Sequence, residues 1–209
     1  MVTGHDDWTV YFGVPRGAVV LPVHDEPDPG PWARKAARGQ LGPETPDELV
    51  DDLADALTEA TLDARMRNPV SAFFFCPDPT LGELARIEVS NLDPDDELPE
   101  VTVERMAEFL ATPTERSVNR PETEYGDLPI GPAVRVCHQY VDRGMGPGAD
   151  VAGPGTILQT CAYAARPPEI GSAVLLMVSW RALAYSDELF DLTDRLAQAL
   201  RLVRGSVTD

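Results

Sequence analysis

Apolar residues recur at steps of three and four between Pro46 and Arg67, a spacing typical of an amphipathic helix. The face that this spacing predicts to be buried carries Leu49, Leu53, Leu57, Ala60 and Ala64. Thr45 and Glu48 flank a proline in a capping-box sequence, in which the two side chains satisfy free N–H groups of the first turn. The pattern therefore predicts one long helix that is capped by Thr45.

Runs of alternating, β-branched and aromatic residues predict six strands, at residues 8–14, 70–76, 84–92, 133–142, 155–165 and 172–180. The short link between the second and third runs favours a hairpin, and the last three runs follow one another as a meander. Further amphipathic helices are expected at 32–41, 103–111 and 187–203, the last two capped by Thr102 and Ser186. We therefore predict an α+β fold in a single domain over residues 1–209, with a largely antiparallel sheet of about six strands and helices packed on it.

Two segments lack a regular pattern. Residues 112–132 contain four prolines, and residues 143–154 are rich in glycine. Irregular segments of this length in a compact domain are often functional. If they cover a pocket, Arg120, Tyr125 and His138 are the side chains that we expect to reach a bound ligand.

The charge of the chain narrows the choice of partner. Among its 209 residues, 35 acidic and 17 basic side chains give a net charge of −18. Nucleic acid and anionic membranes both require a basic surface, so neither is expected as a partner. The longest apolar run, Ala173 to Trp180, is too short to span a bilayer, and the first residues lack the pattern of a secretory signal. We expect a cytoplasmic protein.

Motifs for chemistry are absent from the sequence. The three cysteines show no CxxC spacing, which favours buried reduced thiols, and the three histidines lack the spacing of metal ligands. Cys137 and His138 are adjacent on a predicted strand and point to opposite faces. No nucleophile elbow or phosphate-binding loop occurs. We therefore predict no catalytic residue, no metal and no cofactor.

An acidic stripe marks the outer side of the long predicted helix. Its members are Glu48, Asp52, Asp55, Glu59 and Asp63. Such a stripe is either a solvated face or a docking surface for a basic partner, and repulsion between its members costs a few tenths of a kcal/mol per pair. Trp32, which follows a loop of prolines and acids, is a candidate for an exposed anchor beside it.

The C-terminal third carries a family resemblance. A strand at Ser172–Trp180 leads through a short link into an amphipathic helix that contains Glu188-Leu189-Phe190-Asp191. This arrangement resembles the end of PsbP-like α/β/α sandwich proteins. Segments such as Trp32-Ala33-Arg34 and Ala85-Arg86-Ile87-Glu88-Val89 resemble those of uncharacterised actinobacterial proteins. The resemblance implies a binding or assembly factor without catalytic residues.

Three functions follow as hypotheses. The first is a non-enzymatic interaction protein, of an accessory, chaperone or immunity type, whose acidic surface binds a basic or amphipathic protein. The second is a small-molecule-binding protein or enzyme with its pocket under the two irregular segments. The third is a homo-oligomeric structural component, because a charge of −18 still permits a local apolar interface.

Overall fold

The computed structural model describes residues 8–24, 28–96, 98–142 and 155–204. In chain order the elements are β1 Trp8–Tyr11, β2 Ala18–Leu21, α1 Gly30–Leu41, α2 Asp47–Arg67, β3 Ser71–Phe75, β4 Ala85–Leu92, α3 Val103–Leu110, β5 Glu122–Leu128, β6 Gly131–Asp142, β7 Thr156–Ala165, β8 Ala173–Trp180, α4 Ser186–Ala199 and β9 Arg201–Arg204. Single 3₁₀ turns lie at Pro79–Leu81 and Leu183–Tyr185. The predicted α+β class is confirmed.

Seven strands form one antiparallel sheet in the order β2-β3-β4-β8-β7-β6-β5. The predicted hairpin is β3–β4, and the predicted meander is β6–β7–β8. The first predicted strand does not join this sheet: β1 pairs with β9 in a separate ribbon. The sheet gains β2 and β5 instead, so its strand count exceeds the prediction by one.

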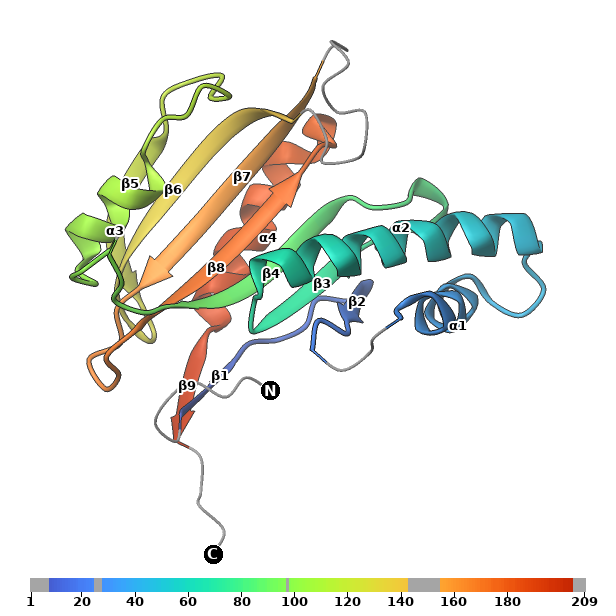
Figure 1. Ribbon diagram of the computed structural model, residues 1–209, viewed down its shortest axis with the longest axis horizontal. Coiled ribbons are helices and arrows are strands. Elements are labelled where there is room, and N and C mark those ends of the chain that lie inside the picture. The colour runs from blue at the N-terminus through green and yellow to red at the C-terminus, as the bar shows by residue number, and fades with distance from the viewer. Residues whose placement is uncertain (1–7, 25–27, 97, 143–154, 205–209) are drawn as a thin grey trace, which may run out of the picture.

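Helices cover both faces of the sheet (Figure 1). The long helix α2 lies over β2 and β3, and α1 packs along one side of α2. Apolar residues of both helices contact Phe74 and Ala72 of β3. Helix α3 packs on the same face over β6 and β7. The opposite face is covered by α4, whose leucines pack against Val178, Leu176 and their neighbours in the largest core cluster. The prediction of a single domain over residues 1–209 stays a prediction.

The ends of two predicted helices differ from expectation. Helix α2 begins at Asp47 without a side-chain cap, because the hydroxyl of Thr45 donates to the carbonyl of Leu41 at 2.8 Å. Helix α4 ends at Ala199, and Ser186 accepts a hydrogen bond from the indole of Trp180 at 3.0 Å instead of capping the helix. The cap of α3 is confirmed, since the Thr102 hydroxyl accepts from the backbone N–H of Arg105 at 3.2 Å.

The buried side of α2 is rotated relative to the prediction. Leu49 is exposed. The residues that face the core are Val50, Leu53, Ala54, Leu57, Ala60, Thr61 and Ala64. The sheet lies under only one flank of the helix, so Leu49, at the start of α2, has no core to enter.

Between α2 and α3 part of the sheet carries no helix. There β4, β8, β7 and β6 present polar side chains among the apolar ones, among them Arg86, Ser179, Thr160 and Tyr140. Alternation along each strand places these four on the α2 side of the sheet, opposite the core under α4. This open section of sheet is where the pocket described below lies.

Candidate functional site

The solvent side of α2 carries four carboxylates that remain exposed: Glu48, Asp52, Asp55 and Glu59. From here on, the name acidic stripe refers to these four residues, without Asp63, which the predicted stripe included. At 3.6 residues per turn they lie within about 60° of one another around the helix and extend over about 16 Å of its length. None of the ion pairs in the described part of the chain includes any of them. The stripe is therefore a row of free negative charges.

Two large apolar side chains continue the same line toward the C-terminal end of α2. Leu62 is 49% exposed and Met66 is 64% exposed. The complete face, from Glu48 to Met66, extends over about 27 Å. The outer face of α2 thus combines a row of exposed carboxylates with two exposed apolar side chains at its C-terminal end.

The carboxylates on the α1 flank of α2 are in a different state. Asp47 pairs with Arg38 and lies 3.7 Å from Arg34, and Asp51 pairs with Arg34. These contacts fasten α1 to α2. They also explain why the free charges are confined to the outer line.

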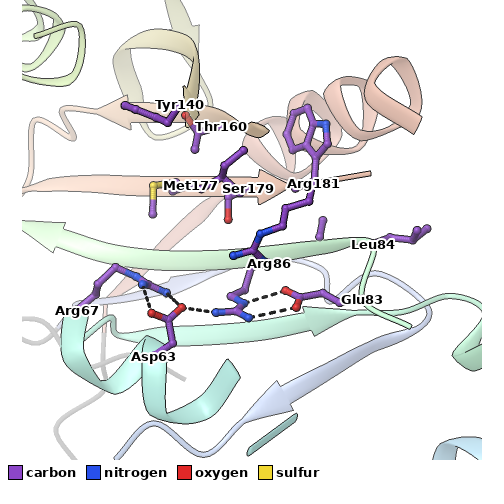
Figure 2. A pocket seen from close by; sticks show the side chains of 13 residues that line it. Asp63, Arg67, Glu83, Leu84, Arg86, Tyr140, Thr160, Met177, Ser179 and Arg181 are labelled. Atoms are coloured by element: carbon purple, nitrogen blue, oxygen red, sulfur yellow. Dashed lines mark hydrogen bonds and ion pairs between the residues drawn. The ribbon is translucent and has the colours of Figure 1, made fainter. Parts of the chain in front are cut away.

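Asp63, the fifth residue of the predicted stripe, belongs to an inner ionic network instead. Its two oxygens accept hydrogen bonds from Arg67 at 2.9 and 3.0 Å, and it also pairs with Arg86 of β4 (Figure 2). Arg86 binds Glu83 through two hydrogen bonds, of 2.8 and 3.1 Å. Arg67 reaches Glu88 of β4, whose carboxylate is only 4% exposed, at 2.9 Å. We call Asp63, Arg67, Glu83, Arg86 and Glu88 the inner network.

The inner network lowers the pKa of Asp63. Burial acts in the opposite direction and raises the pKa, but the hydrogen bonds and charge of Arg67, with the charges of Arg86 and Arg181, outweigh it. The carboxylate of Asp63 is therefore held in its charged form. A group that is fixed by two arginines in this way is structural, and it is not free to act as a docking charge.

A pocket of about 350 Å³ lies beside the inner network, on the open section of the sheet. Figure 2 shows Tyr140, Thr160, Met177 and Ser179 on its floor, with Arg181 reaching across from the end of β8. The volume is at the lower end of the range for small-molecule sites. The lining combines hydroxyl groups and paired arginines with apolar side chains, a composition suited to binding. Among the described residues we find no nucleophile beside a base in this pocket.

Trp32 does not stand free of the core as the sequence suggested. It lies near the start of α1, is half-buried, and packs against the cluster that α1 and α2 form with β3. Its role as an exposed anchor is therefore not supported.

The three candidate ligand residues are not brought together. Arg120 and Tyr125 are both exposed, Arg120 in the segment before β5 and Tyr125 on β5, and the strand itself replaces much of the predicted irregular segment. His138 is buried on β6. Residues 143–154, the other predicted cover, lie outside the described residues. The expected pocket under these two segments therefore stays a prediction, while the pocket found among the described residues lies beside the inner network.

His138 has an unusual setting for a buried polar side chain. It is 1% exposed, and neither ring nitrogen has a hydrogen-bond partner of ordinary geometry among the described residues. Its ring lies against that of Tyr140, with a centroid distance of 4.1 Å. Burial lowers the pKa of His138, while the nearby backbone of Asn119 raises it by a smaller amount. The imidazole is therefore held neutral.

The sequence did contain a signal for the inner network. In β4, Arg86 and Glu88 alternate with Ala85, Ile87 and Val89, so two opposite charges share one face of an otherwise apolar strand. Their partners on α2 could not be named without the fold. Among the described residues, no group of three or more histidine, cysteine or acidic side chains could hold a metal ion. No helix in the same residues is long and apolar enough to cross a membrane.

Comparison with known proteins finds a solved structure with a similar fold. No family model matches the chain, and no curated protein sequence is significantly similar to it. The crystal structure of LpqN, described as involved in cell envelope biogenesis of Mycobacterium tuberculosis, is similar with a TM-score of 0.51 and 11% sequence identity. The match covers 96% of this chain and 86% of LpqN. At this identity the likeness shows a shared fold alone.

Proposed function

We propose that this chain is a non-enzymatic accessory protein that binds a basic or amphipathic protein partner through the outer face of α2. One observation carries the proposal: four exposed carboxylates, which form no ion pair with any described residue, share a line with the exposed Leu62 and Met66. A partner helix with lysines or arginines at steps of three and four, followed by apolar residues, matches this face in charge and spacing. The net charge of −18 favours the encounter.

Two further points support an accessory role. The pocket brings together no reactive pair of side chains among the described residues, and LpqN, which shares the fold, is named for a part in cell envelope biogenesis. The PsbP-like relationship and a cytoplasmic location are parts of the same proposal. So is a protein partner rather than nucleic acid or membrane, because the free charges are negative.

Matched neutral variants test the proposal. The first variant carries Glu48→Gln, Asp52→Asn, Asp55→Asn and Glu59→Gln. The control carries Asp93→Asn, Asp96→Asn, Glu100→Gln and Glu115→Gln, which are equally exposed and remove the same charge away from α2. The probe is a synthetic lysine–leucine amphipathic helix, and its binding is followed by fluorescence anisotropy at low and high salt.

The stripe variant should bind the probe about tenfold more weakly than the wild type, since four exposed ion pairs contribute about 0.4 kcal/mol each. The control should stay within about threefold of the wild type, and high salt should remove the difference between them. Equal losses in the two variants would mean that only the net charge attracts the probe, and the proposal would then be wrong.

A photocrosslinking residue at Met66 identifies the natural partner in extract of the source cells. A matched probe at Phe109, exposed on α3, serves as the control. A product that is specific to position 66 and is lost in the stripe variant supports the proposal. A product that contains only a second copy of this chain would instead favour a homo-oligomer.

Binding of a small molecule is a second candidate, favoured by the pocket of about 350 Å³. Its hydroxyl groups and the apolar surface of Leu158 and Met177 suit an uncharged, partly apolar ligand, because the guanidinium groups of Arg67 and Arg86 are engaged by carboxylates. Ser179→Trp would fill the pocket. Thermal-shift screening against wild type and this variant should then find compounds that stabilise only the wild type.

A further inference from the structure

Two cysteines face each other on the neighbouring strands β6 and β7. Cys137 of β6 and Cys161 of β7 are direct partners in the strand register, and their sulfur atoms are 2.8 Å apart. Both are buried free thiols on the face that α4 covers. Two thiols in mutual contact on adjacent strands are placed for a joint reaction.

Strand geometry permits a bond between these residues. Directly opposite residues of antiparallel strands have Cα atoms about 4.5–5.5 Å apart. Disulfides accept Cα separations of about 4.4–6.8 Å. The two sulfurs can therefore be joined without a change in the register of β6 and β7.

The surroundings distinguish one sulfur from the other. Arg135 and Tyr163 form the next pair on the same face, and they line a small pocket of about 150 Å³ that opens beside β5. Contact with Cys161 and the charge of Arg135 lower the pKa of Cys137 against the effect of burial. Contact with Cys137 and burial raise the pKa of Cys161. Cys137 is thus the sulfur that loses its proton first, and at 5% exposure against 0% for Cys161 it is also the less buried of the two.

We infer that Cys137 and Cys161 form a dithiol–disulfide couple that a hydroperoxide closes. The Cys137 thiolate attacks the peroxide, whose O–O bond breaks, and the products are a sulfenic acid and, with hydrogen peroxide, water. The Cys161 thiol then attacks the sulfenic sulfur, forms the S–S bond and releases a second water. In total two thiols are oxidised, one peroxide is reduced, and both thiol protons leave in water. A dithiol reductant reverses the closure by exchange.

The third cysteine provides an internal control. Cys76 follows β3 and belongs to the cluster under α1 and α2, on the opposite face of the sheet. Burial raises the pKa of Cys76 to about 11. With no thiol partner among the described residues and an unfavourable pKa, it should stay reduced under the same treatment.

Thiol counting by mass spectrometry tests the inference on the full chain. The reduced protein is treated with hydrogen peroxide, denatured and labelled with N-ethylmaleimide, which marks all three cysteines of an untreated sample. Peroxide should leave a single label, on Cys76, and a peptide map should show Cys137 linked to Cys161. Dithiothreitol should restore all three labels.

Substitutions separate this couple from general oxidation. Cys76→Ser should form the same link as the wild type, whereas Cys137→Ser and Cys161→Ser should form no intramolecular link. The peptide map of the wild type decides the question even if a serine variant folds poorly. Three labels after peroxide treatment, a link that involves Cys76, or sulfinic acid without any link would each overturn the inference.

Discussion

Helix α2 carries carboxylates of the same kind on two sides, and their surroundings make them different groups. On the outer side Glu48, Asp52, Asp55 and Glu59 are exposed and form no ion pair with any described residue. On the sheet side Asp63 is held by Arg67 and Arg86 within the inner network. The inner network fixes the helix to β4, whereas the outer carboxylates hold no other element of the described chain. Arginines thus reach the carboxylates on the α1 flank and on the sheet side of α2, and leave the outer four unpaired among the described residues.

The largest effect is expected from Arg86→Met, which removes the cation between two carboxylates. The guanidinium of Arg86 is only 11% exposed and binds both Glu83 and Asp63. Without this guanidinium, the carboxylates of Asp63 and Glu83 are partly buried and lose a shared cation. We therefore expect a destabilisation of about 3 kcal/mol. Urea denaturation measures the change in the free energy of unfolding. A change below about 1 kcal/mol would show that the inner network is not structural and would remove the contrast between the two sides.

Asp63→Asn should have the next largest effect, with a specific pH dependence. The folded state holds the pKa of Asp63 below its ordinary value of 3.8, so the carboxylate stabilises the fold above that pH. This contribution is lost as the pH falls through the lower pKa of the folded state. At pH 7 the variant should be about 2 kcal/mol less stable, the usual size for hydrogen bonds to a charged group.

The difference between wild type and Asp63→Asn should shrink when urea denaturation is repeated below pH 4. Asp52→Asn is the matched control on the outer side, and at pH 7 it should unfold within about 0.5 kcal/mol of the wild type. If the two variants behave alike, Asp63 belongs functionally to the acidic stripe after all.

The sequence contained enough information for α2, for the β3–β4 hairpin and for the β6–β7–β8 meander, because each has a strong local pattern. It was insufficient for β5, whose residues Glu122–Leu128 are nearly all exposed and show no alternation of apolar side chains. That strand exists because the edge of β6 is available for pairing. Likewise Val203 continues the helical spacing of Leu196 and Leu200, and pairing with β1 places it in a strand instead.

The candidate site was predictable to a similar degree. Periodicity correctly predicted that the four residues of the acidic stripe are exposed. Exposure on a helix depends mainly on the angular position of a residue around the helix axis. The state of Asp63 depends on Arg86, which lies 23 residues further along the chain. The roles of Thr45 and Ser186 also changed because each hydroxyl found a nearby partner, the Leu41 carbonyl and the Trp180 indole. Contacts between elements decide such cases, and local sequence does not report them.

A smaller effect is expected at His138, which provides a second contrast with Asp63. Arginine partners hold Asp63 charged, whereas burial lowers the pKa of His138 below the ordinary 6.5, against a smaller opposite effect of the Asn119 backbone, and holds the imidazole neutral. The unfolded chain therefore binds the proton more readily, and the wild type should lose stability as the pH falls below about 6.5. His138→Leu should flatten the stability profile between pH 7 and pH 5 in thermal unfolding. A profile that is equally steep in His138→Leu would contradict this account.

The smallest effect should come from neutralising the acidic stripe itself. The four carboxylates have no cation to lose, and neighbours at steps of three and four repel one another by a few tenths of a kcal/mol per pair. The variant with Glu48→Gln, Asp52→Asn, Asp55→Asn and Glu59→Gln should therefore unfold within about 0.5 kcal/mol of the wild type, or slightly above it in stability. Urea denaturation at low salt measures this, because added salt screens the repulsion that is being removed. A loss of more than about 1 kcal/mol would mean that the outer carboxylates stabilise the fold, and their value as free docking charges would then be refuted. A stable variant that no longer binds the basic probe would show that the two sides of α2 have different roles. Neutralising a carboxylate would then reduce stability on the sheet side, at Asp63, and reduce binding on the outer side.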